Sequence, residues 1–546
     1  MVDRFQFRKI ERIIRKSLEA MHLKSAVYKT IMIPTQEIAL HRLKKIMSKS
    51  SGTKLKDNGK KIVFISVDAR HMPHTYLESS IAKSLQLRGH NLKMIICNGC
   101  LSMCSSHFTV EKPPNKWSCE NCKNFSKKFY EITKLPFAPF SDYIKQNQIK
   151  TIKDKVNKLS LEECENLVYK GIKVGYHSIT SAQRYFKGVI PEKKIYEPIL
   201  RAELINAMIS TDVAEKAYIL EKPDILVSSH GCYSSWGSFS DYMIDKKVPT
   251  YIWGSGETNV MRFVYPKSDF NKYFKDIRKE KMLNEKEEKE LTEFLNRRFK
   301  GKAGQVVLYG FSDTKADDLK KKFNFDKFDK TFFMLPNVPW DVAAVSKIGP
   351  FKDVIDWIDY TINVFKKHPN LLLLIKVHPS EIYRAESKET VFDYIKGKFS
   401  PLPENIKVIP PVTTINPYSL FQFADVGLIF TGTAGIEMTL SGIPVIPGGD
   451  AHYAGRGFTF DANTKKEFEK LLLKDLKLSS YQKKLVRVYA YFHFIKTYIP
   501  RDFINTNNFL TTSWTFNSLD EIAPGNNRYI DIICNFILKG GVYQDW

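Results

Sequence analysis

The chain has 546 residues, which is too long for one ordinary domain and long enough for two domains with extensions. Hydrophobic residues make up 43% and aromatic residues 13%, which excludes a largely disordered chain. No apolar run reaches the roughly 18 to 20 residues that span a bilayer, and no signal-peptide pattern opens the chain, so we expect a cytoplasmic protein.

The charge is strongly positive, with 84 Lys and Arg against 59 Asp and Glu and a formal net charge of +25. Such a field attracts polyanions, namely nucleotide-sugars, acidic glycans, anionic lipid surfaces and nucleic acid. Much of the excess is scattered lysine, and solvated lysine faces account for it equally well. No recognisable nucleic-acid-binding module accompanies the charge, so nucleic acid is the least favoured partner.

Residues 1 to about 48 show apolar positions at helical spacing with basic residues between them. The apolar positions are Phe7, Ile10, Ile13, Ile14, Leu18 and Met21. This pattern predicts a basic amphipathic helix. It either packs on the protein body or another subunit, which we favour, or lies on an anionic membrane beside a lipid-linked acceptor. This helix and the polar linker that follows it make up residues 1–58, an extension before the first domain.

A β-α-β unit opens the first domain, with strands at 62–67 and 92–96 around a helix at about 75–88. Residues that follow a strand in such a unit face the ligand. Asp68, His71 and His74 are therefore candidates for binding an acceptor or deprotonating its hydroxyl group, with helix capping and surface exposure as alternatives. We assign residues 59–325 to this Rossmann-like domain.

Five of the eight cysteines form the pattern Cys-x2-Cys-x3-Cys followed by Cys-x2-Cys. Closely spaced thiolates on two turns are what tetrahedral Zn²⁺ requires, and stable disulfides are not expected in the cytoplasm. We therefore predict a small zinc-ribbon-like insertion at 97–122 with a structural Zn²⁺. Four ligands suffice, so the choice stays open among Cys97, Cys100, Cys104, Cys119 and Cys122, with His107 as a substitute ligand.

Two later strands of the first domain also end in residues with useful chemistry. The strand at 225–229 leads into His230, Tyr233 and Trp236, and the strand at 248–253 leads towards Glu257. We expect His230 and Glu257 to act on the acceptor, and Tyr233 or Trp236 to stack on a sugar ring or simply to pack. Residues 175–184 are predicted to add a loop that carries Ser178, Ser181 and Arg184.

Two buried-type strands of the second domain end at polar or small residues. Small residues at 431–435 let the backbone approach a ligand, and a helix at 434–440 would direct its N–H groups at a phosphate. The alternative is an ordinary β-α-β unit whose glycines serve only tight turns. From the strand ends, the turn and the loop at 448–457, the donor-binding candidates are Lys376, His378, Glu381, Thr431, Gly432, Thr433, Gly435, His452 and Arg456.

Four segments, at 335–341, 376–381, 431–437 and 442–446, carry a family resemblance. They read Leu-Pro-Asn-Val-Pro-Trp-Asp, Lys-Val-His-Pro-Ser-Glu, Thr-Gly-Thr-Ala-Gly-Ile-Glu and Gly-Ile-Pro-Val-Ile. The chain resembles the bacterial and archaeal surface or capsular polysaccharide biosynthesis proteins of the two-domain GT-B architecture, well over about 325–460 and loosely in its first half. The resemblance implies that His378 and residues 431–433 hold a donor nucleotide and that Glu437 contacts its ribose or sugar. It also favours the ligand set Cys97, Cys104, Cys119 and Cys122, with Cys100 and Cys104 as an alternative pair.

Residues and resemblance together predict a glycosyltransferase whose active site lies between domain 59–325 and a nucleotide-sugar-binding domain at 326–480. Helices at 481–546 are expected to cross back onto the first domain. The donor is a nucleotide-sugar, CMP-linked as a first expectation, and the acceptor is a surface polysaccharide or a lipid-linked glycan. No redox cofactor is expected. No catalytic metal is expected either, because Lys376, His378 and Arg456 supply positive charge at the phosphate. The alternatives are a sugar-nucleotide epimerase or polyol-phosphate transferase of the same architecture, and a non-catalytic nucleic-acid-binding protein.

Overall fold

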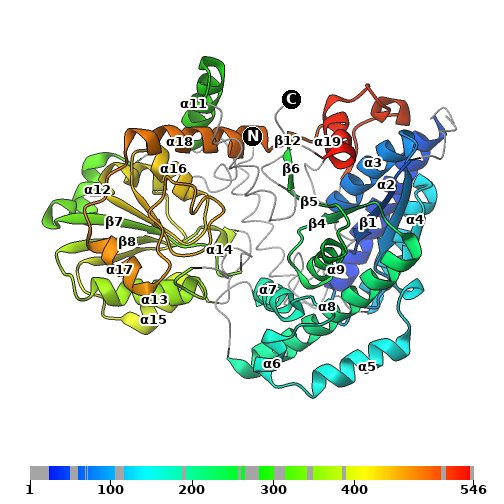
Figure 1. Ribbon diagram of the computed structural model, residues 1–546, viewed down its shortest axis with the longest axis horizontal. Coiled ribbons are helices and arrows are strands. Elements are labelled where there is room, and N and C mark those ends of the chain that lie inside the picture. The colour runs from blue at the N-terminus through cyan, green and yellow to red at the C-terminus, as the bar shows by residue number, and fades with distance from the viewer. Residues whose placement is uncertain are drawn as a thin grey trace.

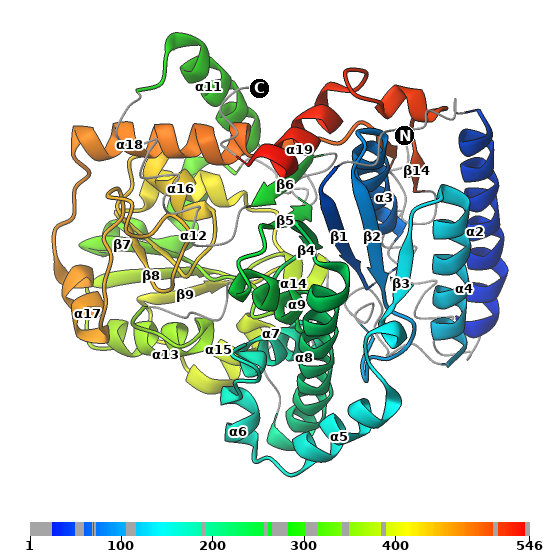
Figure 2. The same cartoon turned by 45° about the vertical axis from the view of Figure 1, so that its right-hand side comes forward.

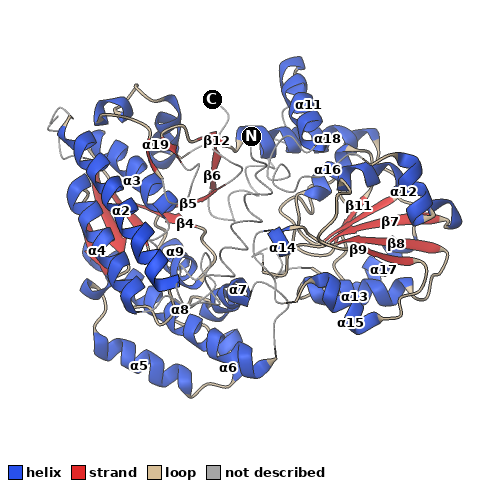
Figure 3. Ribbon diagram, turned by 180° about the vertical axis from the view of Figure 1, so that it is seen from behind, coloured by secondary structure: helices blue, strands red, loops and turns tan. Residues whose placement is uncertain are grey.

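The computed structural model of the protein describes twelve stretches of the chain: 24–49, 59–67, 69, 72–104, 116–186, 192–255, 260–264, 282–300, 314–340, 349–383, 389–505 and 512–540. Within these stretches the chain forms two α/β lobes that lie side by side (Figure 1). Each lobe is built on its own sheet of mainly parallel strands flanked by helices (Figure 3). The prediction of an α/β protein with two parallel sheets is therefore confirmed.

The first lobe contains a sheet with the strand order β12-β6-β5-β4-β1-β2-β3. Its parallel strands are β1 (Lys61–Ser66), β2 (Asn91–Ile96), β3 (Phe137–Pro139), β4 (Ile225–Ser229) and β5 (Thr250–Ser255). The strand β6 (Val260–Val264) runs antiparallel to β5, and β12 (Ile499–Pro500) runs antiparallel to β6. In β1 every residue after the first is buried, as expected for a strand that is covered on both faces.

Helices cover both faces of the first sheet. Ile62 and Phe64 of β1 point into a core formed with α3 (Met72–Leu87), α4 (Lys116–Thr133) and α19 (Arg528–Lys539). Val63 and Ile65 point the other way, into a core formed with α7 (Val174–Phe186), α8 (Lys193–Glu221) and α9 (Ser234–Asp245). The shorter helices α5 (Gln146–Asn157) and α6 (Leu161–Asn166) extend this second face. The alternation follows from the two-residue period of a strand.

The helix α2 (Lys24–Ser48) lies along α4 on the outside of the first lobe (Figure 2). From residue 36 onward its side chains are described, and Ala39, Leu40 and Leu43 are buried in the first core. Gln36 accepts a hydrogen bond from Asn121 of α4 at 3.0 Å. This part of the predicted amphipathic extension therefore packs on the protein body, and residues 1–23 lie outside the described residues.

The second lobe contains an all-parallel sheet with the order β11-β10-β7-β8-β9. Its strands are β7 (Lys330–Leu335), β8 (Leu371–Lys376), β9 (Ile406–Ile409), β10 (Val426–Ile429) and β11 (Val445–Pro447). One face is covered by α13 (Val354–Phe365), α15 (Val391–Phe399) and α17 (Lys465–Leu473). The other face is covered by α12 (Ala316–Phe323) and α16 (Ala434–Leu440), with α11 (Glu285–Phe299) and α18 (Ser480–Tyr491) packed outside α16.

The end of the chain returns to the first lobe. After α18, a π-helical turn η7 (Phe492–Lys496) leads directly to β12, which pairs with β6 of the first sheet. The hairpin β13 (Ile504–Asn505) with β14 (Ser513–Trp514), the turn η8 (Leu519–Ile522) and α19 then pack against α3 (Figures 1 and 2). The first lobe is thus completed by residues from the opposite end of the sequence.

Candidate functional site

In both sheets the strand order reverses at one point, and ligands of open α/β sheets bind beside the carboxyl ends of the strands at such a point. The reversal falls between β1 and β4 in the first sheet and between β7 and β10 in the second. The residues that follow these four strands therefore define where the candidate sites lie.

The reversal point of the second sheet is held together by Asn337, which follows β7. Its side-chain oxygen accepts a hydrogen bond from the Thr431 N–H at 3.0 Å, and Thr431 follows β10. Asn337 is buried, with 8% of its surface exposed. Sequence reasoning missed it as a site residue, although it stands in the segment at 335–341 that carries the resemblance.

The small-residue turn at 431–435 is covered on one side by the loop at 448–457. Tyr453 donates a hydrogen bond to the Gly432 carbonyl at 2.6 Å, and a Cβ atom at Gly435 would lie 2.1 Å from the Tyr453 hydroxyl oxygen. A Cβ atom at Gly432 would meet nothing closer than 3.7 Å. Gly435 therefore serves close packing within the lobe, whereas packing does not require a glycine at position 432, where an added Cβ would make only ordinary van der Waals contact.

His378, two residues beyond β8, is half-buried at the same edge of the sheet. The Ser380 N–H donates to His378 Nδ1 at 3.1 Å. Because Nδ1 accepts this bond, the proton of the neutral ring lies on Nε2, where it is suited to donate to a ligand oxygen.

Lys376 and Glu381, which flank His378, are turned into the protein and are 2% and 0% exposed. Lys376 Nζ donates to the Val377 carbonyl at 2.8 Å, and burial, opposed by the charge of Glu381, lowers its pKa to about 8. Glu381 accepts the Val391 N–H at 2.8 Å, and burial raises its pKa to about 8. The Glu381 bond ties α14 (Ser380–Tyr383) to the start of α15.

Glu437 of α16 is buried with both carboxylate oxygens engaged. One accepts from Arg298 Nε at 2.6 Å, and the other accepts from the Tyr418 hydroxyl at 2.7 Å. Arg298 ends α11 and Tyr418 lies in η6 (Pro417–Phe423). These bonds tie three elements together, and a contact of Glu437 with a donor ribose stays a prediction.

His452 and Arg456 lie on the loop at 448–457, beside the turn that Tyr453 contacts. His452 Nδ1 is 2.5 Å from the Tyr489 hydroxyl oxygen, and its ring stacks on His493 with 4.5 Å between ring centroids. Burial lowers the pKa of Arg456, and the nearby Tyr489 opposes this shift. His493, in the π-helical turn, was missed by sequence reasoning because its contact is formed across 41 residues of sequence.

Two histidines meet at the reversal point of the first sheet. His74, near the start of α3, and His230, directly after β4, have ring centroids 5.2 Å apart. His230 has a left-handed backbone with φ of 58°, which is uncommon for a non-glycine residue, and Ser229 Oγ contacts its Nδ1 atom. The other predicted residues of this edge, Asp68, His71 and Glu257, lie outside the described residues.

Of the two alternatives for Tyr233 and Trp236, the structure supports packing over stacking on a sugar, because only 6% and 3% of their surfaces are exposed. Both rings pack in the core with α7 and α8. The predicted loop at 175–184 is wrong, since these residues form α7. Ser181 accepts the Ser234 N–H at 2.9 Å and so holds the start of α9, while Ser178 is buried and Arg184 lies in the last turn of α7.

The two lobes approach each other through α7 and the loop at 448–457. Burial raises the pKa of the Tyr176 hydroxyl, and the charges of Cys232 and Asp450 raise it further. Tyr176 belongs to the first lobe and Asp450 to the second. In His177, beside Tyr176, Nε2 lies 2.8 Å from Asp241 Oδ2 and Nδ1 lies 3.0 Å from the Cys232 carbonyl oxygen. These contacts fix the loop that carries His230.

The predicted zinc ligands lie after β2 and on α4, and their binding of a metal stays a prediction. Burial is the main cause that raises the pKa of the Cys97 thiol to about 12, while the Gly99 N–H opposes the shift and Cys104, Cys100 and Cys119 add to it. Cys119 and Cys122 lie on the helix α4, not on a turn, and Cys122 packs towards the first core. Within the described part of the chain, no three His, Cys, Asp or Glu side chains are grouped as metal ligands.

The fold and these two edges define a two-lobed α/β protein with candidate ligand sites at the strand ends. Residues 262–503, which include the second-lobe edge and the crossing segment, match the family described as capsule polysaccharide biosynthesis protein. The resemblance to capsular polysaccharide biosynthesis proteins is thus confirmed over that stretch. No curated protein matches the chain.

Solved structures similar to the chain include two bacterial enzymes. The β-Kdo 2,4-transferase KpsC of Thermosulfurimonas dismutans is 13% identical with a TM-score of 0.35, over 54% of this chain and 86% of that one. The UDP-GlcNAc 2-epimerase of Neisseria meningitidis is 12% identical with a TM-score of 0.24, over 80% of this chain and 99% of that one.

Among the described residues, no helix is both long and apolar enough to cross a membrane.

Proposed function

We propose that the protein is a glycosyltransferase of capsule polysaccharide biosynthesis, which moves a sugar from a nucleotide-sugar to a glycan acceptor between the two sheet edges. The observation that carries the proposal is the edge of the second sheet, where the uncrowded turn at Gly432, the half-buried His378 and the cationic Arg456 belong to a stretch that matches the capsule family. Hydrogen-bond donors and positive charge at a strand end are suited to a nucleotide phosphate.

On the donor side, His378 Nε2–H and the Arg456 guanidinium stabilise the charge that develops on the departing phosphate. The backbone and hydroxyl groups of residues 431–433 position that phosphate. The bond that breaks joins the sugar carbon to the phosphate oxygen, and the nucleotide leaves with the electron pair. A CMP-linked sugar is the donor that the resemblance favours.

On the acceptor side, His230 is the general base. With Nδ1–H donating to the Ser229 hydroxyl oxygen, Nε2 is unprotonated and takes the proton from the acceptor hydroxyl as its oxygen attacks the sugar carbon. His74 stands beside it and orients the acceptor. Asp68, His71 and Glu257 remain candidates for the same edge.

The donor proposal is tested by thermal unfolding with CMP, UDP, GDP, dTDP and their sugars. We expect one nucleotide to raise the Tm of the wild type and of His41→Gln, a control at an exposed histidine of α2, but not of His378→Gln. If every nucleotide is without effect, or if His378→Gln responds like the control, the donor site is not where we propose it.

The role of His230 is tested by product formation with the donor that binds. We expect His230→Gln to lower kcat by roughly 10²- to 10⁴-fold while the thermal shift by the donor is kept. Turnover of the nucleotide-sugar without any acceptor, unchanged in His230→Gln, would point instead to the epimerase alternative.

We also propose two features that accompany this function. The first is a structural Zn²⁺ bound by four of the five clustered cysteines. It rests on their spacing, and elemental analysis of the purified protein decides it.

The second is contact with an anionic membrane, which rests on the basic outer face of α2, with Arg42, Lys44 and Lys45 exposed. Co-sedimentation with phosphatidylserine vesicles that is lost in high salt would support that contact.

A further inference from the structure

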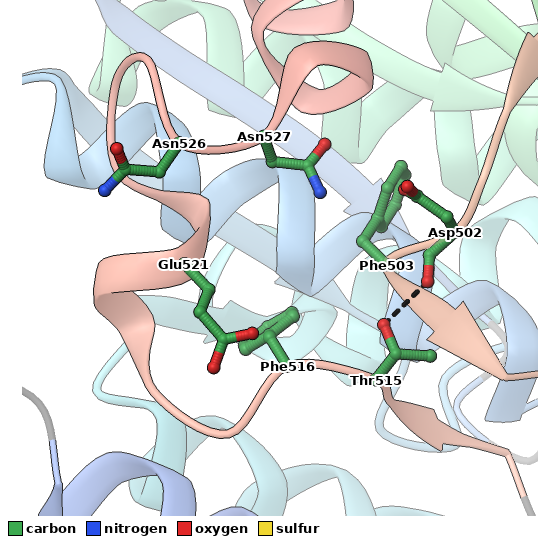
Figure 4. Close-up of a pocket in the computed structure, with 7 residues that line it drawn as sticks. All are labelled: Asp502, Phe503, Thr515, Phe516, Glu521, Asn526 and Asn527. Carbon is green, nitrogen blue, oxygen red and sulfur yellow. Dashed lines mark hydrogen bonds between the residues drawn. The ribbon is translucent and has the colours of Figure 1, made fainter.

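A cavity of about 260 Å³ lies in the C-terminal segment that returns to the first lobe, apart from both sheet edges (Figure 4). Its polar lining consists of Asp502, Thr515, Glu521, Asn526 and Asn527. The buried rings of Phe503 and Phe516 complete the wall. The volume is below the 300–1,000 Å³ of pockets for drug-sized ligands and suits a single sugar ring.

The cavity offers acceptors and donors that the described residues leave unused. The Asp502 carboxylate has no partner among the described residues, because only its backbone carbonyl is engaged, by the Thr515 hydroxyl at 2.7 Å. One oxygen of Glu521 accepts the Asn517 N–H at 2.9 Å, which leaves the other available. Asn527 caps α19 through its oxygen, at 2.9 Å from the Ile530 N, and thus keeps its NH₂ group for a ligand.

This combination favours a neutral ligand rich in hydroxyl groups. Two carboxylates repel an anion, although the chain as a whole carries a formal charge of +25. A carboxylate accepts hydrogen bonds from sugar hydroxyls, and a carboxamide NH₂ donates to sugar oxygens. The Asn526 NH₂ group already donates to the Asp520 carbonyl at 2.7 Å, so the NH₂ donor left for a ligand is that of Asn527, which a bare cation would not use.

The segment that forms the cavity is fixed along α3. Trp514 Nε1 donates to the Tyr76 carbonyl at 3.0 Å, Ser84 donates to the Ile522 carbonyl at 2.7 Å, and Arg88 pairs with Asp531. The first turn of α3 carries His74, the acceptor residue proposed above. With a rise of 1.5 Å per residue the helix is about 24 Å long, so a glycan of a few sugar units can span from the cavity to His74.

We propose that this cavity binds a neutral sugar residue. Its role as an acceptor subsite, away from the point of transfer, rests on the proposed glycosyltransferase function.

The binding site is tested by saturation-transfer NMR and titration with the neutral methyl glycosides of glucose, galactose, mannose and N-acetylglucosamine, with methyl glucuronide as the anionic counterpart. We expect at least one neutral glycoside to bind the wild type, and the glucuronide not to bind. Asp502→Ala and the milder Asp502→Asn should weaken binding about ten-fold, as expected for lost hydrogen bonds to a charged group. Asp154→Ala, at an exposed carboxylate of α5, is the matched control and should bind as the wild type does.

The site is overturned if no neutral glycoside binds, if the Asp502 variants bind as well as the control, if the glucuronide binds better, or if Ca²⁺ displaces the glycoside. The measurement needs neither donor nor turnover. Sugar binding in a protein without transferase activity would therefore reject the proposed function and leave this site standing.

Discussion

Gly435 shows how one residue sets the packing at the edge of the second sheet. A Cβ atom there would lie 2.1 Å from the Tyr453 hydroxyl oxygen and 2.7 Å from Cζ of its ring. We predict that Gly435→Ala destabilises the second lobe by about 1–3 kcal/mol, because the ring must move and its hydrogen bond to Gly432 is lost. Urea unfolding measures this effect.

Gly397 provides the matched control for that substitution. It lies in α15, and a Cβ atom there would meet nothing within 4 Å. Gly397→Ala should be neutral or stabilising by up to about 1 kcal/mol. Equal destabilisation by the two substitutions would contradict the packing role of Gly435.

At the residue scale, the sequence indicated the small-residue turn after β10 but not the partners of the residues around it. The run of small residues at 431–435 was recognisable because its composition is local. The hydrogen bond between Asn337 and Thr431 and the stack of His452 on His493 join residues far apart in sequence. No local pattern encodes such contacts, and the same limit left Glu437 without its partners Arg298 and Tyr418.

The element formed by the end of β8 and α14 should make stability depend on pH. Burial raises the pKa of Glu381 from 4.5 to about 8, so its folded form holds a proton that the unfolded form releases, and stability is lost as pH rises from about 4.5 to 8. Burial lowers the pKa of Lys376 from 10.5 to about 8, so stability is regained between about 8 and 10.5. We predict a stability minimum of the second lobe near pH 8.

Urea unfolding at several pH values measures this profile. Glu381→Gln should remove most of the loss between pH 5 and 8, whereas Glu404→Gln, at an exposed carboxylate, should keep it. A wild type whose stability is flat across that range would show that neither buried group titrates as stated.

At the element scale, the buried strands were predicted well because each is a short apolar run, as in 62–67 and 426–430. Two segments were misread. The stretch at 175–184 contains Gly and Ser residues that disfavour helices, but α7 forms because it packs on α8. The buried Ser178 hydroxyl is satisfied there by the Val174 carbonyl. The pair Cys119 and Cys122 was read as a turn for a metal, and it lies on α4.

At the scale of the molecule, the returning segment should make the first lobe depend on residues near the end of the chain. Ile533 of α19 is fully buried against α3, so Ile533→Ala should destabilise the first lobe by about 2–4 kcal/mol. In calorimetry, Ile533→Ala should lower the Tm of one unfolding transition, that of the first lobe. Gly435→Ala should lower the Tm of a different transition, that of the second lobe. Ile195→Ala, at a residue that is 52% exposed, should leave both unchanged. A single transition that both core variants shift equally would mean that the lobes unfold as one unit.

The interleaved path of the chain also bears on how the protein is made. On the ribosome, β1 and α3 emerge more than 400 residues before β12 and α19, which cover the edge of the sheet and the apolar side of α3. Until α19 has emerged, Tyr76 and Leu85 lack part of their final cover, while the second lobe holds all of its strands by residue 447. The lobe that is synthesised first is therefore the one that finishes folding last, and a nascent chain needs protection from aggregation until α19 has been made.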